Sequence, residues 1–237
     1  MVRIEFLFPE FCNLFADSSN IKYLMQCLPE AELINTAFTD QPLFAADTPD
    51  LIYMGAMTEK KQEMVIAKLL PYKERLQALI EAGVPMLFTN NALEILGEYI
   101  ETDEGRKIPA LGIYPFHAKQ DMMHRFNCLL RGQFKGMEIL GFKTQFTMAY
   151  GDTDRYPFIS VDKGCGMNKE TMNEGIHDHN LFATYLVGPF LINNPDFTLY
   201  LMREVMGIKE AALAYEPVIY AAYERRKKEF HDPKTQY

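Results

Sequence analysis

Short apolar runs alternate with segments of helical periodicity over the first 97 residues of the chain. Four apolar runs have the length of strands and are rich in Leu, Ile, Phe and Met, at 2–8, 31–36, 50–56 and 84–89. Between them, residues 20–28 and 58–82 carry apolar side chains at helical spacing, and Pro71 predicts a kink or break in the longer segment. Strands that alternate with helices pair in parallel and are covered on both faces. The sequence therefore predicts an α/β fold with an open, mostly parallel sheet flanked by helices.

The second half of the chain has a different pattern. Three candidate strands follow one another without helices between them, at 124–131, 137–148 and 157–161. We expect them to add an antiparallel extension to the sheet. A further strand at 181–187 leads to a helix that begins near Asn194-Pro195, with proline in its first turn. Residues from about 209 to 230 are helical in pattern, although Pro217 interrupts them, and their aromatic face can pack on the core or dock on a partner.

Composition places the chain among ordinary globular proteins, with 48% hydrophobic and 24% charged residues. No repeat or Ser/Gly linker divides the sequence, so we expect a single domain over residues 1–237. The formal net charge of −8 argues against a nucleic-acid partner, because binding a phosphate backbone needs a basic face.

Neither a membrane segment nor a metal site is indicated. The start, MVRIEFLFPEF, lacks the regions of a signal peptide, and no apolar run approaches the roughly 20 residues of a membrane span. We therefore expect a cytoplasmic protein without a membrane span. The four cysteines have no metal-ligand spacing, so no metal or cofactor is predicted.

The segment VPMLFTNNALEILG, residues 84–97, indicates a buried strand that turns sharply into a helix, with Asn90 at the turn. Such an elbow exposes one side chain above the carboxyl end of the sheet, where Gly55 also lies. A cysteine or serine there would indicate acyl transfer, whereas an amide side chain cannot attack a carbonyl at neutral pH. The amides of Asn90 and Asn91 can cap the helix, line a remodelled ligand pocket, or do both.

Eight segments, taken in order, resemble class I glutamine amidotransferase-like proteins of the cobyric-acid-synthase (CobB/CobQ) type. They are FPEFCNLFADSSNI (8–21), MGAMTEKKQ (54–62), VPMLFTNNALEILG (84–97), IPALGIY (108–114), LGFKTQF (140–146), GCGMN (164–168), EGIHDHN (174–180) and ATYLVGPFLINNPDF (183–197). The resemblance implies an open, flavodoxin-like sheet. It is strongest to glutaminase subunits that work with a Mur-ligase-like partner to amidate lipid II in bacterial cell-wall synthesis.

The resemblance also shows which chemical groups are replaced. The family's elbow reads Val-Cys-Gly-Gly-Tyr-Gln, and with Leu96-Gly97 fixing the register its cysteine falls on Asn90. The family's Tyr-Leu-His-Gly-Pro places its general base on Val187. A cysteine nucleophile works through a thiolate that the histidine keeps available. Asn90 and Val187 are therefore degenerate catalytic positions, and we expect no glutaminase activity from them.

The resemblance implies four candidate ligand contacts, Gly55, Asn91, Arg125 and Gln145. Gly55 remains from the family's oxyanion turn, although Ala56 and Met57 stand where glycine and glutamine are usual. Arg125 lies about where the family has an arginine that contacts glutamine, and Thr144-Gln145 replaces an Asn-His pair. Glutamine is thus a possible ligand of a changed pocket.

Other residues provide weaker candidates for chemistry. Cys165 lies in a Gly-rich turn near His177 and His179 in sequence and could supply a displaced nucleophile, but a small residue in a tight turn explains it as well. The two histidines lack a third ligand of matching spacing, so they do not indicate a metal site.

Three functional hypotheses follow. The first is an amidotransferase-like protein without glutaminase activity that acts as partner or regulatory subunit of a Mur-ligase-like or other synthetase. The second is an altered enzyme, either a small-molecule amide hydrolase or transferase or a glutaminase completed by partner residues. The third is a module that binds a small metabolite without turnover.

Overall fold

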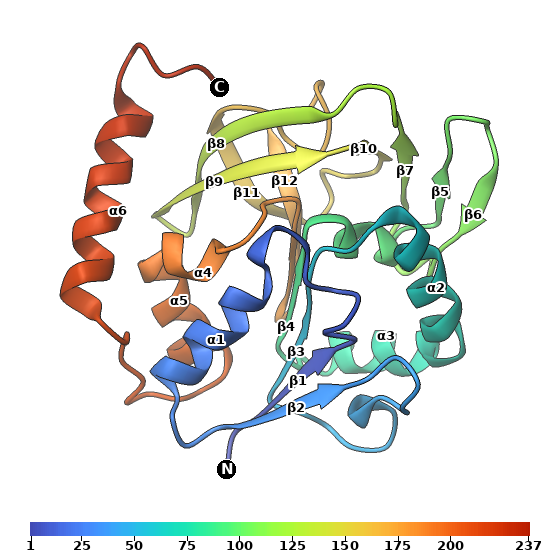
Figure 1. Cartoon of the computed structure of the whole chain (residues 1–237), viewed down its shortest axis with the longest axis horizontal. Coiled ribbons are helices and arrows are strands. Elements are labelled where there is room, and N and C mark those ends of the chain that lie inside the picture. Colours follow the sequence, from blue (N-terminus) through green and yellow to red (C-terminus); the bar gives the residue numbers. More distant parts are fainter.

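The computed structural model describes residues 1–237, and a nine-stranded sheet forms its centre (Figure 1). The strand order is β2-β1-β3-β4-β13-β12-β11-β8-β9. Five neighbouring strands are parallel to one another: β2 (Glu32–Thr36), β1 (Arg3–Leu7), β3 (Leu51–Met54), β4 (Met86–Thr89) and β13 (Leu181–Thr184). The other four pair antiparallel: β12 (Asn173–Asp178), β11 (Pro157–Lys163), β8 (Phe126–Phe134) and β9 (Met137–Gln145). The predicted parallel sheet with an antiparallel extension is confirmed.

Helices cover both faces of the parallel part. They are α1 (Ser18–Cys27), α2 (Glu59–Leu69), α3 (Lys73–Glu81), α4 (Phe190–Asn193) and α5 (Pro195–Tyr200). The last helix, α6 (Glu216–His231), packs against β9 of the antiparallel part and against α4 and α5. Figure 1 shows α1, α4 and α5 on one side of the parallel strands and α2 and α3 on the other. Strands β3 and β4 are buried along their whole length, as expected for a sheet covered on both faces.

The long helix predicted over 58–82 forms as two helices. A short 3₁₀ turn, Leu70–Tyr72, separates α2 from α3, because Pro71 lacks the N–H that a continuous helix needs. Thr58 caps α2, with its hydroxyl accepting from the Lys61 N–H at 3.4 Å, and Glu59 lies in the first turn. The helix that follows β4 is a 3₁₀ helix, Asn90–Leu96.

The sequence pattern missed a second, smaller sheet. It has the order β10-β7-β5-β6 and contains β10 (Thr147–Gly151), β7 (Phe116–Gln120), β5 (Tyr99–Glu101) and β6 (Lys107–Pro109). The strand predicted over 137–148 is wrong in extent, because the chain leaves β9 at Gln145 and enters the second sheet as β10 at Thr147. The two sheets therefore meet beside residue 146, close to the carboxyl ends of the parallel strands.

The C-terminal helix differs from its prediction. Pro217 does not interrupt α6 but lies in its first turn, where no N–H is required, and residues 209–215 are not helical. Tyr223 and Phe230 of α6 pack on Leu140 of β9, so part of the aromatic face is used within the chain. No helix in the structure is both long and apolar enough to cross a membrane.

Candidate functional site

Asn90 forms a sharp elbow at the end of β4. Its φ of +52° is a left-handed conformation that asparagine adopts more readily than most residues. The side chain is 3% exposed, and its amide nitrogen donates to the carbonyl oxygens of Tyr185 (3.2 Å) and Thr144 (3.4 Å). The interpretation of Asn90 as a helix cap is wrong, because Thr89 occupies the cap position and the Asn90 amide bonds instead to chain segments at β13 and β9.

Asn91 joins the elbow to the loop after β3. Its side-chain oxygen accepts from the Met57 N–H at 3.0 Å, and its side-chain nitrogen donates to the Met57 carbonyl at 2.8 Å. Gln62 of α2 donates to the Asn91 carbonyl oxygen at 2.7 Å. Asn91 therefore does not cap the helix either, because both the oxygen and the nitrogen of its side-chain amide bond to Met57 in the loop after β3.

Asp17 holds together the loops below the elbow. Its carboxylate accepts from the backbone N–H groups of Ala56 (2.6 Å) and Gly188 (2.7 Å) and from the Thr89 hydroxyl (2.8 Å). These partners follow β3 and β13 or end β4, so one buried side chain fixes three strand ends. Burial raises the pKa of Asp17 to about 6, although its hydrogen bonds oppose the shift.

Gly55 and Val187 lie outside the cavity above the elbow. A Cβ atom at Gly55 would lie 2.5 Å from the carbonyl oxygen of Cys12, so only glycine fits this close approach. Val187 is 8% exposed, and its N–H donates to the Phe142 carbonyl at 3.0 Å. Neither residue lines the cavity, whose volume is about 140 Å³.

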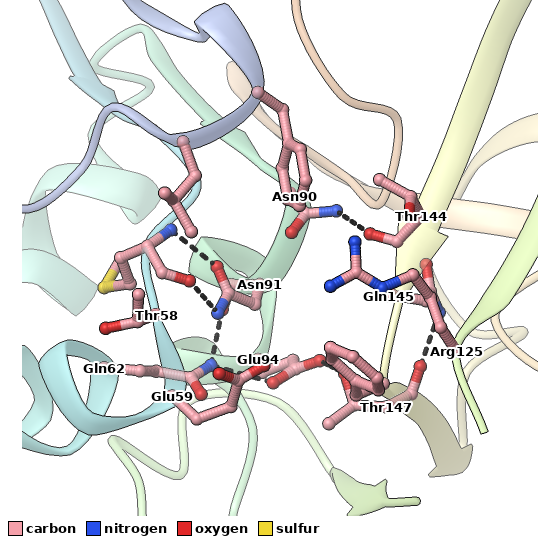
Figure 2. Close-up of a pocket in the computed structure, with 14 residues that line it drawn as sticks. Thr58, Glu59, Gln62, Asn90, Asn91, Glu94, Arg125, Thr144, Gln145 and Thr147 are labelled. Carbon is pink, nitrogen blue, oxygen red and sulfur yellow. Dashed lines mark hydrogen bonds between the residues drawn. The ribbon is translucent and has the colours of Figure 1, made fainter. Parts of the chain in front are cut away.

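The cavity brings together the other three predicted ligand contacts. Asn91, Arg125 and Gln145 line it together with Asn90 and Glu94. Figure 2 shows the guanidinium of Arg125 pointing across the cavity toward the two asparagines. The Gln145 amide nitrogen donates to the Thr147 carbonyl at 2.5 Å, whereas its buried side-chain oxygen has no partner. The guanidinium and the polar side chains that line this small space suit a polar ligand.

Glu94 is the titratable group that the sequence reasoning missed. It is fully buried, and its carboxylate accepts from the Thr147 hydroxyl and, at 2.8 Å, from the Gln62 amide. Removal from water raises its pKa to about 7. The signal was present in the elbow motif, because Glu94 stands where the family's Val-Cys-Gly-Gly-Tyr-Gln has its glutamine.

The cysteines lie away from the cavity. Burial raises the pKa of Cys12, Cys27 and Cys128, and these three thiols are buried. Cys165 is partly exposed, its thiol donates to the Asn168 carbonyl at 2.9 Å, and burial raises its pKa as well. No thiol stands in for a cysteine at the elbow.

His177, on β12, and His179, in the turn after that strand, have separate environments. His177 stacks on Phe182, with ring centroids 4.6 Å apart, and burial lowers its pKa. His179 pairs with Asp178 at 2.9 Å. No group of three or more His, Cys, Asp or Glu side chains is arranged to hold a metal ion.

Comparison with known proteins identifies the fold family. Residues 3–195 match the CobB/CobQ-like glutamine amidotransferase domain. The chain belongs to this family. The family and the α/β fold predicted from the motifs are thereby confirmed.

Two curated relatives match most of the chain. The GatD subunit of lipid II isoglutaminyl synthase (glutamine-hydrolyzing) from Staphylococcus aureus is 27% identical over 207 residues, covering 86% of this chain and 84% of the relative. The GatD subunit from Streptococcus pneumoniae is 22% identical over 213 residues, covering 88% and 82%.

Solved structures with similar chains are more distant. PurLQS from Thermotoga maritima aligns with a TM-score of 0.48 at 12% identity, covering 95% of this chain and 99% of its own. A glutamine amidotransferase from the same organism aligns with a TM-score of 0.49 at 9% identity, covering 96% and 92%.

Proposed function

We propose that this chain is a glutamine amidotransferase-like subunit that does not hydrolyse glutamine and that serves a larger amidating ligase as partner or regulator. The observation that carries the proposal is the Asn90 side chain at the elbow. It occupies the position of the family's nucleophile, and its nitrogen is committed to the carbonyls of Tyr185 and Thr144.

The chemistry of the site supports the loss of hydrolysis. A thioester route needs a thiolate and a nearby group that moves protons. Asn90 offers no thiolate, Val187 cannot titrate, and none of the four cysteines lines the cavity. The fold is kept while the two groups that perform the reaction are absent.

The relatives support the partner. Both are subunits of lipid II isoglutaminyl synthase, and each aligns over more than 80% of both chains. We therefore assign this chain to a cytoplasmic complex with a Mur-ligase-like synthetase that amidates lipid II. In that complex the amidotransferase-like surface would serve for association, while nitrogen would come from another source.

Ammonia release from glutamine tests the proposal. The purified chain, alone and with its co-purified ligase, should release no more ammonia than a heat-denatured control. Turnover that disappears when a cysteine is alkylated would overturn the proposal. Turnover only in the presence of the ligase would instead favour a glutaminase completed by partner residues.

One observation favours a second candidate, a small-molecule amide hydrolase or transferase with a remodelled site. Glu94 has a pKa near 7 and lies in the same cavity as Arg125 and Gln145, and a carboxyl with that pKa is suited to general acid-base catalysis. This candidate predicts turnover of a small amide that Glu94→Gln abolishes. Conversion of a panel of small amides by the wild-type chain and by Glu94→Gln decides between the two.

A further inference from the structure

Two cysteines that are far apart in sequence, Cys128 of β8 and Cys165 in the turn after β11, come together outside the elbow cavity. The two strands pair antiparallel up to Lys163, which faces Arg131. At the next residue, Gly164, a Cβ atom would lie 3.2 Å from the Cys128 sulfur. The backbone N–H of Cys165 donates a hydrogen bond to the same sulfur. The backbone at Cys165 therefore lies against the Cys128 side chain.

A hollow of about 250 Å³ opens beside both cysteines, which contribute to its lining. Cys165 is partly exposed, whereas Cys128 is only 5% exposed. Each thiol donates to a backbone carbonyl at 2.9 Å, Cys128 to that of Leu129 and Cys165 to that of Asn168. A small reagent that enters the hollow therefore reaches the Cys165 sulfur before the Cys128 sulfur.

A buried lysine places a positive charge near both thiols. Lys143 is fully buried, and its ammonium donates to the Gly166 carbonyl at 2.7 Å and lies 3.5 Å from the Glu174 carboxylate. Burial raises the pKa of both cysteine thiols, and the Lys143 ammonium opposes the shift in each. The thiolate is the form that attacks a disulfide, so this ammonium favours exchange at the pair.

We propose that Cys128 and Cys165 are a redox-sensitive pair that closes to a disulfide when the chain meets a small-molecule disulfide. Residues that face each other across antiparallel strands have Cα atoms about 4.5–5.5 Å apart, within the roughly 4.4–6.8 Å that a disulfide spans. The new bond fastens the turn 164–168 to β8. Excess thiol reopens it, so the pair is a site of reversible modification.

The exchange takes two steps. The Cys165 thiolate attacks one sulfur of the small disulfide, forms a mixed disulfide and releases one small thiolate. The Cys128 thiol then gives up its proton and attacks the Cys165 sulfur, which releases the second small thiolate. Each cysteine loses one hydrogen, and the small disulfide accepts two electrons and two protons to leave as two thiols.

The intact mass of the folded chain after incubation with oxidised glutathione at pH 8 tests the pair. We expect the wild type to lose two hydrogen atoms per chain and to carry no glutathione, and dithiothreitol should reverse the change. Peptide mapping without reduction should recover the Cys128 peptide joined to the Cys165 peptide. This result does not depend on whether the chain hydrolyses glutamine, so it stands apart from the proposed function.

Single substitutions separate the two roles. Cys128→Ala should stop at the mixed disulfide and keep one glutathione on Cys165. Cys165→Ser should form neither the disulfide nor an adduct in the same time, because the Cys128 thiol is buried. Cys27→Ala is the matched control, because Cys27 is a buried thiol that lines a different hollow, and it should react like the wild type. Unchanged melting temperatures under reducing conditions show that the variants fold.

Three outcomes would overturn the inference. They are an unchanged mass of the folded wild type, a glutathione that stays on Cys165 of the wild type, and a disulfide that involves Cys12 or Cys27. The second outcome would show that the Cys128 sulfur does not reach the Cys165 sulfur.

Discussion

The residues below the elbow and the residue at the elbow differ in their roles: the first form a network of buried hydrogen bonds, and the second occupies the position where chemistry is expected. Below it, Asp17 bonds to three chain segments, and the Tyr53 hydroxyl accepts from Asn20 and donates to the Asp17 carbonyl, both at 3.0 Å. At the elbow, the amide of Asn90 stands at the position that the motif register assigns to the family's nucleophile. The shape of the elbow is thus maintained by the buried hydrogen bonds of Asp17 and Tyr53 beneath it. Under our proposal, the amidotransferase fold keeps its elbow without the chemistry of its family.

The largest expected effect is at Asp17. Asp17→Ala leaves the N–H groups of Ala56 and Gly188 and the hydroxyl of Thr89 without their acceptor. Each buried donor left unsatisfied costs about 1–3 kcal/mol, so we expect a loss of about 3 kcal/mol or more in the free energy of unfolding. Urea unfolding measures this, with exposed Asp40→Ala as control and an expected change within about 0.5 kcal/mol. A loss below about 1 kcal/mol for Asp17→Ala would show that the hydrogen bonds below the elbow do not maintain its shape.

Two substitutions of Asn90 separate its bonds from its backbone conformation. Asn90→Ala loses both hydrogen bonds, and alanine adopts the left-handed conformation at a φ of +52° less readily than asparagine does. We therefore expect a loss of about 2 kcal/mol in the free energy of unfolding. Asn90→Gly loses the same bonds without that strain and should be more stable than Asn90→Ala by about 1 kcal/mol. Urea unfolding of the pair checks this, and equal stabilities would remove the argument for a strained elbow.

Glu94 makes the stability of the folded chain depend on pH. Its folded pKa of about 7 lies above the unfolded value of 4.5, so folding takes up a proton between these pH values and stability falls as pH rises through them. Glu94→Gln removes the ionisation. We therefore expect it to be more stable than the wild type at pH 8 by about 1–2 kcal/mol, with a smaller difference at pH 5.

Urea unfolding at both pH values measures this difference. Glu30→Gln, an exposed site without a hydrogen-bond partner, is the control and should show no such difference. A wild-type stability that rises from pH 5 to pH 8, with Glu94→Gln unchanged relative to it, would show that a counter-charge stabilises the ionised carboxylate.

The smallest effect is at Val187. Removal of its two methyl groups in Val187→Ala should cost about 1 kcal/mol in the free energy of unfolding through lost packing, which urea unfolding measures. Val218→Ala, at a side chain that is 68% exposed, is the control for stability. A loss for Val187→Ala no larger than that for Val218→Ala would show that Val187 does not contribute to the packing below the elbow.

The parallel part of the main sheet was predictable because its strands are continuous apolar runs that alternate with helices. The second sheet was not, since β5 and β6 have three residues each and Lys107–Pro109 carries no apolar alternation. The break at Phe146 was missed because the apolar pattern continues through it while the chain passes from one sheet to the other.

The site was predictable only in part. Motif register placed Asn91, Arg125 and Gln145, which do share a cavity, but it also suggested Gly55, which lies below it. Periodicity could not reveal the bonds of the Asn90 amide, because its partners Thr144 and Tyr185 are 54 and 95 residues away in sequence. The raised pKa of Glu94 likewise depends on burial that only the assembled fold creates.

The mass of the intact chain after incubation with a glutamine-like diazoketone tests the central claim most directly. This reagent alkylates a thiolate nucleophile in a glutamine site. The double variant Asn90→Cys/Val187→His is the positive control, because it puts a thiol at the elbow and a histidine at the position that the motif register assigns to the family's base, and it should gain one adduct at residue 90. For the wild type, alone and with its ligase, the account predicts an unchanged mass. A stoichiometric adduct on any wild-type cysteine, blocked by excess glutamine, would contradict it.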